Sequence, residues 1–176
     1  MAQAFEQDPL SSAEKGSAAQ PPSGGGGTEI GQLKGRLLLL FRSGGEWFGL
    51  PIEEVKEVQP LSKITRIPHA PGEILGIMNL RGKVVALYDL LTLLQAPRRP
   101  AQEGDQVIVL DLDPELVVGI VVEGIGQVKE VPLDALKSPF QPRPGPLKGT
   151  LDVDGIAVGI LDLKKLFDPF LGLVHP

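Results

Sequence analysis

The chain has 176 residues, with 22 acidic and 17 basic side chains and a formal net charge of −5, so it lacks the basic surplus of a nucleic-acid-binding surface. It has no cysteine and two histidines, which excludes disulfides and thiolate chemistry and leaves little for a histidine-based metal site. No apolar run approaches the ~18 residues that span a bilayer, and no signal peptide is visible. We therefore expect one domain, or two small ones sharing a core, in a cytoplasmic protein without cofactor or metal.

Residues 1–33 are rich in Ala, Ser, Gln, Gly and Pro and contain a run of four glycines at 24–27. Such a composition cannot bury enough apolar surface to offset the entropy of ordering. We expect a flexible tail there, a folded domain over residues 34–172, and a short C-terminal tail at 173–176. A docking peptide within the first tail is the alternative.

The first half of the folded part alternates short apolar runs with turn residues, which predicts short β-strands. Strands are expected at residues 36–42, 47–52, 55–58, 64–67 and 84–88. A single helical turn is expected just before Val55, and Pro60 should end the strand that follows it. Residues 68–72 hold two prolines and predict a rigid loop.

The stretch from Gly76 to Leu90 organises the prediction. Gly76 and Gly82 permit backbone angles that other residues resist. Asn79 and Arg81 alternate with apolar neighbours, so in an extended segment both side chains would point to the same face of the strand. Asp89 can cap a short helix that buries leucines. The plainer alternative is a structural turn whose arginine is solvated.

The second half of the folded part shows the same alternation of short apolar runs and turn residues. A polar connector at residues 95–105 precedes a hairpin turned by Asp113 and Pro114, and a proline-rich loop is expected at residues 138–146. Further strands are expected at residues 106–112, 116–122, 124–131, 147–151 and 155–161, with a terminal helical turn at 162–167.

Four short motifs recur in the same order in the two halves. Residues 48–50 match 118–120, 55–58 match 128–131, 80–82 match 147–149, and 87–90 match 160–163. Each half would therefore supply about five short strands that could close into a small barrel, and the two barrels should pack on each other. A groove between packed barrels is a natural binding site.

The repeat also helps to separate structural from functional roles, because residues at equivalent positions of the two halves can be compared. Asp89 and Asp162 fall at equivalent strand ends, and helix capping explains both. Arg81 is matched only by Lys148, so a forked cation occurs in one half alone. This asymmetry favours a specific role for Arg81.

The motif over residues 76–85 followed by Asp89 and Leu90, together with the segments at 48–50, 55–58, 65–68 and 117–124, resembles the CheW-like chemotaxis coupling protein family. The resemblance covers roughly residues 37–170. It implies an all-β fold of two intertwined five-stranded SH3-like β-barrels with short helical turns. It also implies a non-enzymatic adaptor that joins a CheA-type histidine kinase to the cytoplasmic hairpin tips of methyl-accepting chemoreceptors.

Site residues follow from the resemblance by matching positions. Those implied to face the receptor are Val55, Gly76, Arg81 and Val128. Those implied to face the kinase are Glu57, Val58 and Ile64. The family also implies a cytoplasmic protein recruited to receptor arrays at the inner face of the membrane, which it would touch only through receptors. The long first tail and the proline-rich loop depart from the family pattern.

Two other functions remain open. A CheW-like scaffold module in a parallel chemosensory pathway, serving surface motility or array localisation, would carry the same motifs. A small hydrolase would need a nucleophile, a base and an orienting group within reach of one another. No serine lies in a strand–turn–helix elbow, and His69 lies in a proline loop, which disfavours the enzyme.

Overall fold

In the computed structural model, the described residues are 35–110, 112, 117–133, 135 and 145–171. Both predicted tails lie outside them, as do the predicted turn at Asp113 and most of the proline-rich loop. The strands are β1 (Gly35–Ser43), β2 (Glu46–Pro51), β3 (Val55–Pro60), β4 (Ile74–Leu80), β5 (Lys83–Asp89), β6 (Gln106–Leu110), β7 (Val118–Val122), β8 (Gly124–Pro132), β9 (Leu147–Val153) and β10 (Ile156–Leu161). The helices are η1 (Ile52–Glu54), α1 (Leu90–Leu93) and α3 (Leu163–Leu171).

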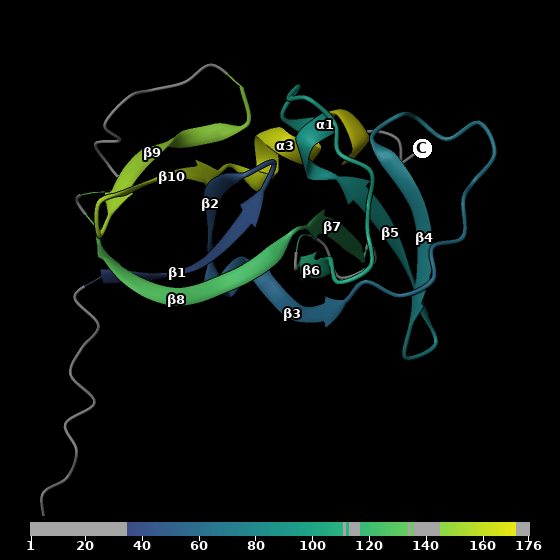
Figure 1. Ribbon diagram of the computed structural model, residues 1–176, viewed down its shortest axis with the longest axis horizontal. Coiled ribbons are helices and arrows are strands. Elements are labelled where there is room, and N and C mark those ends of the chain that lie inside the picture. The colour runs from purple at the N-terminus through teal and green to yellow at the C-terminus, as the bar shows by residue number, and fades with distance from the viewer. Residues whose placement is uncertain (1–34, 111, 113–116, 134, 136–144, 172–176) are drawn as a thin grey trace, which may run out of the picture. The chain divides into compact units, whose positions relative to one another are not determined.

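The strands form two five-stranded sheets with the same internal order (Figure 1). Sheet A has the order β8-β1-β2-β10-β9, and sheet B has the order β3-β6-β7-β5-β4. Neighbouring strands are antiparallel except for β2 with β10 and β5 with β7, which are parallel. Five strands each, in an order that maps one sheet onto the other, confirm the predicted pair of small SH3-like barrels.

The barrels do not coincide with the two halves of the sequence repeat. Sheet B takes the consecutive strands β3 to β7, whereas sheet A combines β1 and β2 with β8, β9 and β10. The chain leaves sheet A after β2, and β8 returns to pair along β1. The expectation that each half closes its own barrel is therefore wrong. The interleaving implied by the family resemblance is what the structure has.

Three clusters of buried side chains hold the fold together. One belongs to sheet A and includes Leu38 and Val158, and another belongs to sheet B and includes Val85 and Val107. The third and largest is shared, with side chains from both sheets and α3. Its buried members are Leu39, Phe41, Phe48, Leu50, Tyr88, Leu90, Ile108, Leu110, Val118, Ile120, Val122, Leu161, Leu163, Leu166 and Phe167. The predicted shared core is thus confirmed.

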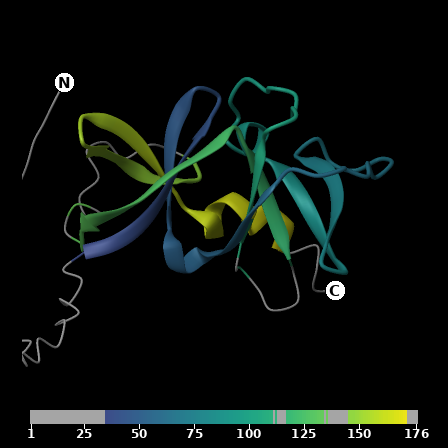
Figure 2. The same ribbon diagram turned by 60° about the horizontal axis from the view of Figure 1, so that its bottom comes forward.

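The two aspartates cap helices as predicted. The Asp89 carboxylate accepts the backbone N–H groups of Leu91 and Thr92 at the start of α1. Asp162 accepts the backbone N–H of Lys165 at the start of α3. Helix α3 runs further than the predicted turn and lies between the two sheets in both views (Figure 2). Its Phe167 ring meets the Tyr88 ring edge-on at 5.1 Å, and this contact ties the helix to sheet B.

A second link between the sheets is an ion network around Arg99. Arg99 Nη2 lies 2.7 Å from Asp105 Oδ1, and Arg99 Nε lies 3.1 Å from Glu123 Oε1. Glu123 also accepts the backbone N–H of Gly44, in the turn between β1 and β2, at 2.7 Å. Because Asp105 immediately precedes β6 in sheet B and is buried, the network joins sheet B to the β1–β2 turn of sheet A.

Two local predictions were wrong. Residues 64–67 do not form a strand, and only Thr65 pairs, through an isolated bridge to Ile77. Prolines at positions 68 and 71 lack an N–H donor, so the ladder cannot extend. Arg81 does not alternate with Asn79 along an extended strand, because β4 ends at Leu80 and Arg81 has φ of 52° in the following turn.

The repeat was misaligned at two motifs. Residues 55–58 correspond to 125–128 rather than to 128–131, because Val55 and Val58 lie opposite Leu110 and Ile108 in sheet B as Ile125 and Val128 lie opposite Phe41 and Leu39 in sheet A. Gly76 lies opposite Leu87 in sheet B, and Gly149 lies opposite Ile160 in sheet A, so these two glycines are the equivalent pair. Five residues further along, the counterpart of Arg81 is Asp154 rather than Lys148. The two residues share a left-handed backbone, with φ of 52° and 54°. The matches at residues 48–50 and 87–90 agree with the strand registers.

Candidate partner-binding site

The hairpin turn between β4 and β5 presents Arg81 to solvent on a rigid backbone. Arg81 and Gly82 both have positive φ, 52° and 82°, which is the pattern of a two-residue type I′ turn. The Asn79 side-chain oxygen accepts the Gly82 N–H at 2.8 Å and holds this turn closed. The Arg81 side chain is 76% exposed, so the turn offers a cation for recognition.

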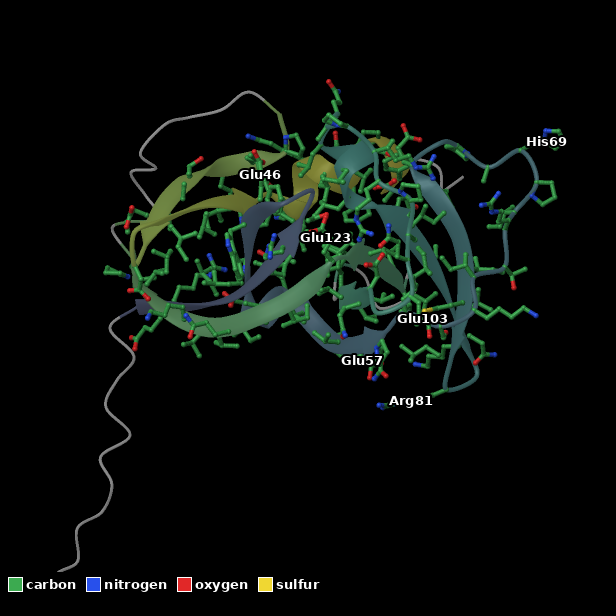
Figure 3. The ribbon with its side chains drawn as sticks, in the orientation of Figure 1. Glu46, Glu57, His69, Arg81, Glu103 and Glu123 are labelled. Carbon is green, nitrogen blue, oxygen red and sulfur yellow. The ribbon has the colours of Figure 1, made fainter. Side chains whose placement is uncertain are left out.

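Arg81 reaches across to β3. Its Nη2 lies 3.1 Å from Glu57 Oε2, and Figure 3 shows the two side chains close together at the edge of sheet B. Gln59 Nε2 donates to the same Glu57 oxygen at 3.1 Å. The structure therefore brings a residue predicted to face the receptor into contact with one predicted to face the kinase. Sequence reasoning missed this pairing, because β3 and β4 are opposite edge strands of sheet B and only the closed fold brings the two side chains together.

Gly76 is buried and has φ of 144°, a backbone conformation that side chains disfavour. A Cβ at this position would lie 2.4 Å from the Thr65 carbonyl oxygen and 2.7 Å from Ile64 Cγ2. The Thr65 N–H and C=O each bond to Ile77 at 2.8 Å directly beside it. The glycine thus lets the segment that carries Ile64 lie against β4.

The remaining predicted residues are spread over both sheets. Val55 and Val58 lie on β3, are partly buried, and pack against the shared cluster. Ile64 is partly buried against the sheet B cluster. Val128 lies on β8 in sheet A and is 48% exposed. The structure brings Arg81 to Glu57 and Ile64 to Gly76, as two separate contacts at sheet B, but places Val128 on the other sheet.

One apolar residue was overlooked. Val84 follows the turn on β5, pairs with Asn79 across the hairpin, and is 62% exposed. Since Val85 is fully buried, strand alternation turns Val84 outward. That alternation was legible in the sequence. Val84 therefore presents an exposed apolar side chain on the strand that follows the Arg81 turn.

The equivalent turn of sheet A has the opposite charge. Asp154 and Gly155 repeat the two positive φ values, and Asp152 accepts the Gly155 N–H at 2.9 Å. Asp154 pairs with Lys129 on β8, as Arg81 pairs with Glu57 on β3. The two turns thus share a geometry but differ in charge, so only the sheet B turn can offer a forked cation to carboxylates or amides.

Within the described ranges, no helix is long and apolar enough to cross a bilayer. The same part of the chain contains no group of three or more metal-ligating side chains.

Comparison with known proteins matches the same region. A family model described as the CheW-like domain matches residues 37–169. The chain is 34% identical to the chemotaxis protein CheW of Klebsiella aerogenes over 107 residues, covering 61% of this chain and 64% of that protein. It is 30% identical to the probable chemotaxis protein CheW of Rhizobium etli over 138 residues, covering 75% and 87% respectively.

A solved structure agrees with the fold. The scaffolding protein TtCheW of Thermoanaerobacter tengcongensis superposes with a TM-score of 0.68 at 26% sequence identity, covering 76% of this chain and 93% of that one. The family model spans most of the chain and every predicted site residue. The chain therefore belongs to the CheW-like domain family of chemotaxis coupling proteins.

Proposed function

We propose that this protein is a non-enzymatic adaptor that couples a CheA-type histidine kinase to the cytoplasmic tips of chemoreceptors. It would act at the inner face of the membrane, reaching the membrane only through those receptors. The observation that carries the proposal is the exposed Arg81 on a closed turn, ion-paired to Glu57 on strand β3 at the other edge of sheet B. A fixed cation beside apolar strand residues suits a surface that holds a partner helix in one register.

The receptor surface in this proposal consists of Arg81 with Val55 and Val128. Val55 and Val128 offer β-branched apolar side chains on β3 and β8, and the Arg81 guanidinium can fork onto polar groups of a helix. Gly76 contributes indirectly. Because its missing Cβ lets Thr65 approach, it positions the segment behind the turn.

The kinase surface consists of Glu57, Val58 and Ile64. All three are partly buried, so each presents only part of its side chain. Ile64 is held by its contact at Gly76, and Glu57 is held by Arg81 and Gln59. The two surfaces share the Arg81–Glu57 pair, which makes a variant at Arg81 the sharpest test of whether they act separately.

The test replaces Arg81 with glycine, since glycine keeps the positive φ of the turn while removing the cation. Lys83→Ala is the matched control, because it removes a neighbouring exposed cation from β5. Binding of a receptor cytoplasmic fragment and of a kinase regulatory domain is titrated separately, with a melting curve for each variant.

Arg81→Gly should weaken receptor binding by about 1–3 kcal/mol, as the loss of an interface hot spot does. Kinase binding should persist, since Gln59 still holds Glu57 in place. If both partners weaken alike and the melting temperature falls steeply, Arg81 is structural and the receptor assignment fails. Pull-down of receptors from native lysate separates the chemotaxis role from the parallel-pathway alternative by the receptors that it captures.

A further inference from the structure

A cleft of about 730 Å³ lies on sheet B, away from the Arg81 turn. One wall is the loop between β3 and β4, which bows outward beyond β4 in Figure 1, and Figure 3 shows His69 at the far end of that loop. The other wall is the connector between α1 and β6, which contributes Arg98, Pro100 and Ala101. Neither wall has a role in the proposed function, apart from Ile64 at one end.

The titratable side chains that line this cleft are Arg66, His69 and Arg98, with no carboxylate among them. Arg66 is exposed and has no hydrogen bond or ion pair with any described residue. Arg98 turns its Nε to Asp89 Oδ2 at 2.8 Å, so its two terminal amino groups remain available as donors. Asp89 offsets one positive charge, and the lining keeps a surplus of about one at neutral pH.

The rest of the lining is apolar. It includes Ile64, Ile74 and Leu75, which are partly buried, and Ile67, which is 42% exposed. His69 has φ of 58°, a strained conformation of the kind that clusters at ligand-clamping loops. A bare inorganic anion would pair with the arginines and leave these apolar side chains without a partner. A nucleic acid would meet the overall charge of −5.

We propose that the cleft binds an acidic, aliphatic segment of a partner protein. Carboxylates of the segment would pair with Arg66 and with the free amino groups of Arg98, and a leucine-type side chain would pack against apolar lining residues such as Ile67. The positive charge of the lining calls for a negatively charged partner. The apolar residues of the lining disfavour a partner segment that is purely polar.

The probe is a blocked peptide of alternating leucine and glutamate, six residues long, titrated at low salt into the isotope-labelled full chain. Its counter-probe has lysine at each glutamate position. Amide resonances of Arg66, Ile67, Leu75 and Ala101 should shift in a saturable way with the acidic peptide and stay still with the basic one. Added salt should weaken binding, since the contact is partly ionic.

Arg66→Glu should lower the affinity for the acidic peptide by about tenfold or more, because it places like charges in contact. Arg66→Gln should give a smaller loss with the fold untouched. Lys164→Glu makes the same change in net charge on α3 and should leave binding within about twofold. Absence of saturable shifts up to millimolar peptide, equal response to the basic peptide, or undiminished binding by Arg66→Glu each overturns the proposal.

Discussion

Gly76→Ala should destabilise the protein far more than the loss of one glycine suggests. The new Cβ would lie 2.4 Å from the Thr65 carbonyl oxygen, so the bridge between Thr65 and Ile77 must open. Losing its two hydrogen bonds costs about 1–3 kcal/mol. Forcing alanine into a positive φ adds about 1–2 kcal/mol. The expected loss in the free energy of unfolding is therefore about 2–5 kcal/mol.

The chain offers a matched control in Gly82→Ala. Gly82 also has positive φ, but a Cβ there would meet nothing within 4 Å. Gly82→Ala should therefore cost only the backbone strain, about 1–2 kcal/mol. The difference between the two variants isolates the contact at Thr65.

The free energy of unfolding of both variants is measured by urea denaturation. The transition is monitored by far-UV circular dichroism and by the fluorescence of Trp47, the single tryptophan. Trp47 lies in sheet A and Gly76 in sheet B, so coincident transitions would also confirm that the shared cluster makes unfolding cooperative. If Gly76→Ala costs no more than Gly82→Ala, then Thr65 does not pack on Gly76 and the reasoning fails.

Three further predictions address the shared core and the ion network. Burial raises the pKa of Tyr88, the single tyrosine, with a smaller effect of Glu73, so its absorbance should titrate above pH 10.0 in the native state and at the ordinary value in urea. Because the pKa of Tyr88 is higher in the folded state, the contribution of Tyr88 to the free energy of unfolding is complete below the unfolded-state pKa and is lost as the pH rises through the folded-state pKa. Equal titration midpoints in the native state and in urea would contradict this prediction. Arg99→Met should cost about 3–5 kcal/mol, since it leaves Asp105 buried without its cation, and a loss below about 0.5 kcal/mol would mean that the network is dispensable. A fragment of residues 96–176 should be molten or aggregate, because it lacks β1 and β2 and with them the centre of sheet A; a cooperatively melting fragment would refute the interleaved fold.

Most strands were legible in the sequence because apolar runs and turn residues act locally. The boundaries of β1, β5 and β8 fall within one or two residues of their predicted ranges. The caps at Asp89 and Asp162 were also legible, since a capping carboxylate needs only the next few backbone N–H groups.

The features that the sequence did not predict depend on contacts between residues that lie far apart in the chain. The alignment of Arg81 with Lys148 followed shared letters, whereas the true register depends on which strand lies opposite each glycine. The Asx-to-glycine spacing in the two turns, from Asn79 to Gly82 and from Asp152 to Gly155, was a better guide. The Arg81–Glu57 pair could not be read from spacing alone, because β3 and β4 occupy opposite edges of sheet B.

The crossing of the chain between sheets sets an order for folding during synthesis. All strands of sheet B are consecutive, so they can pair as soon as β7 has emerged from the ribosome. Strands β1 and β2 emerge first, yet β1 must wait for β8 to cover its outer edge. Until then the nascent chain exposes an apolar hairpin with both edges unpaired, because β2 also waits for β10, and such a surface aggregates or recruits chaperones. Slow translation between β2 and β8 would lengthen the exposure of both edges, whereas slow translation between β8 and β10 would lengthen only that of β2.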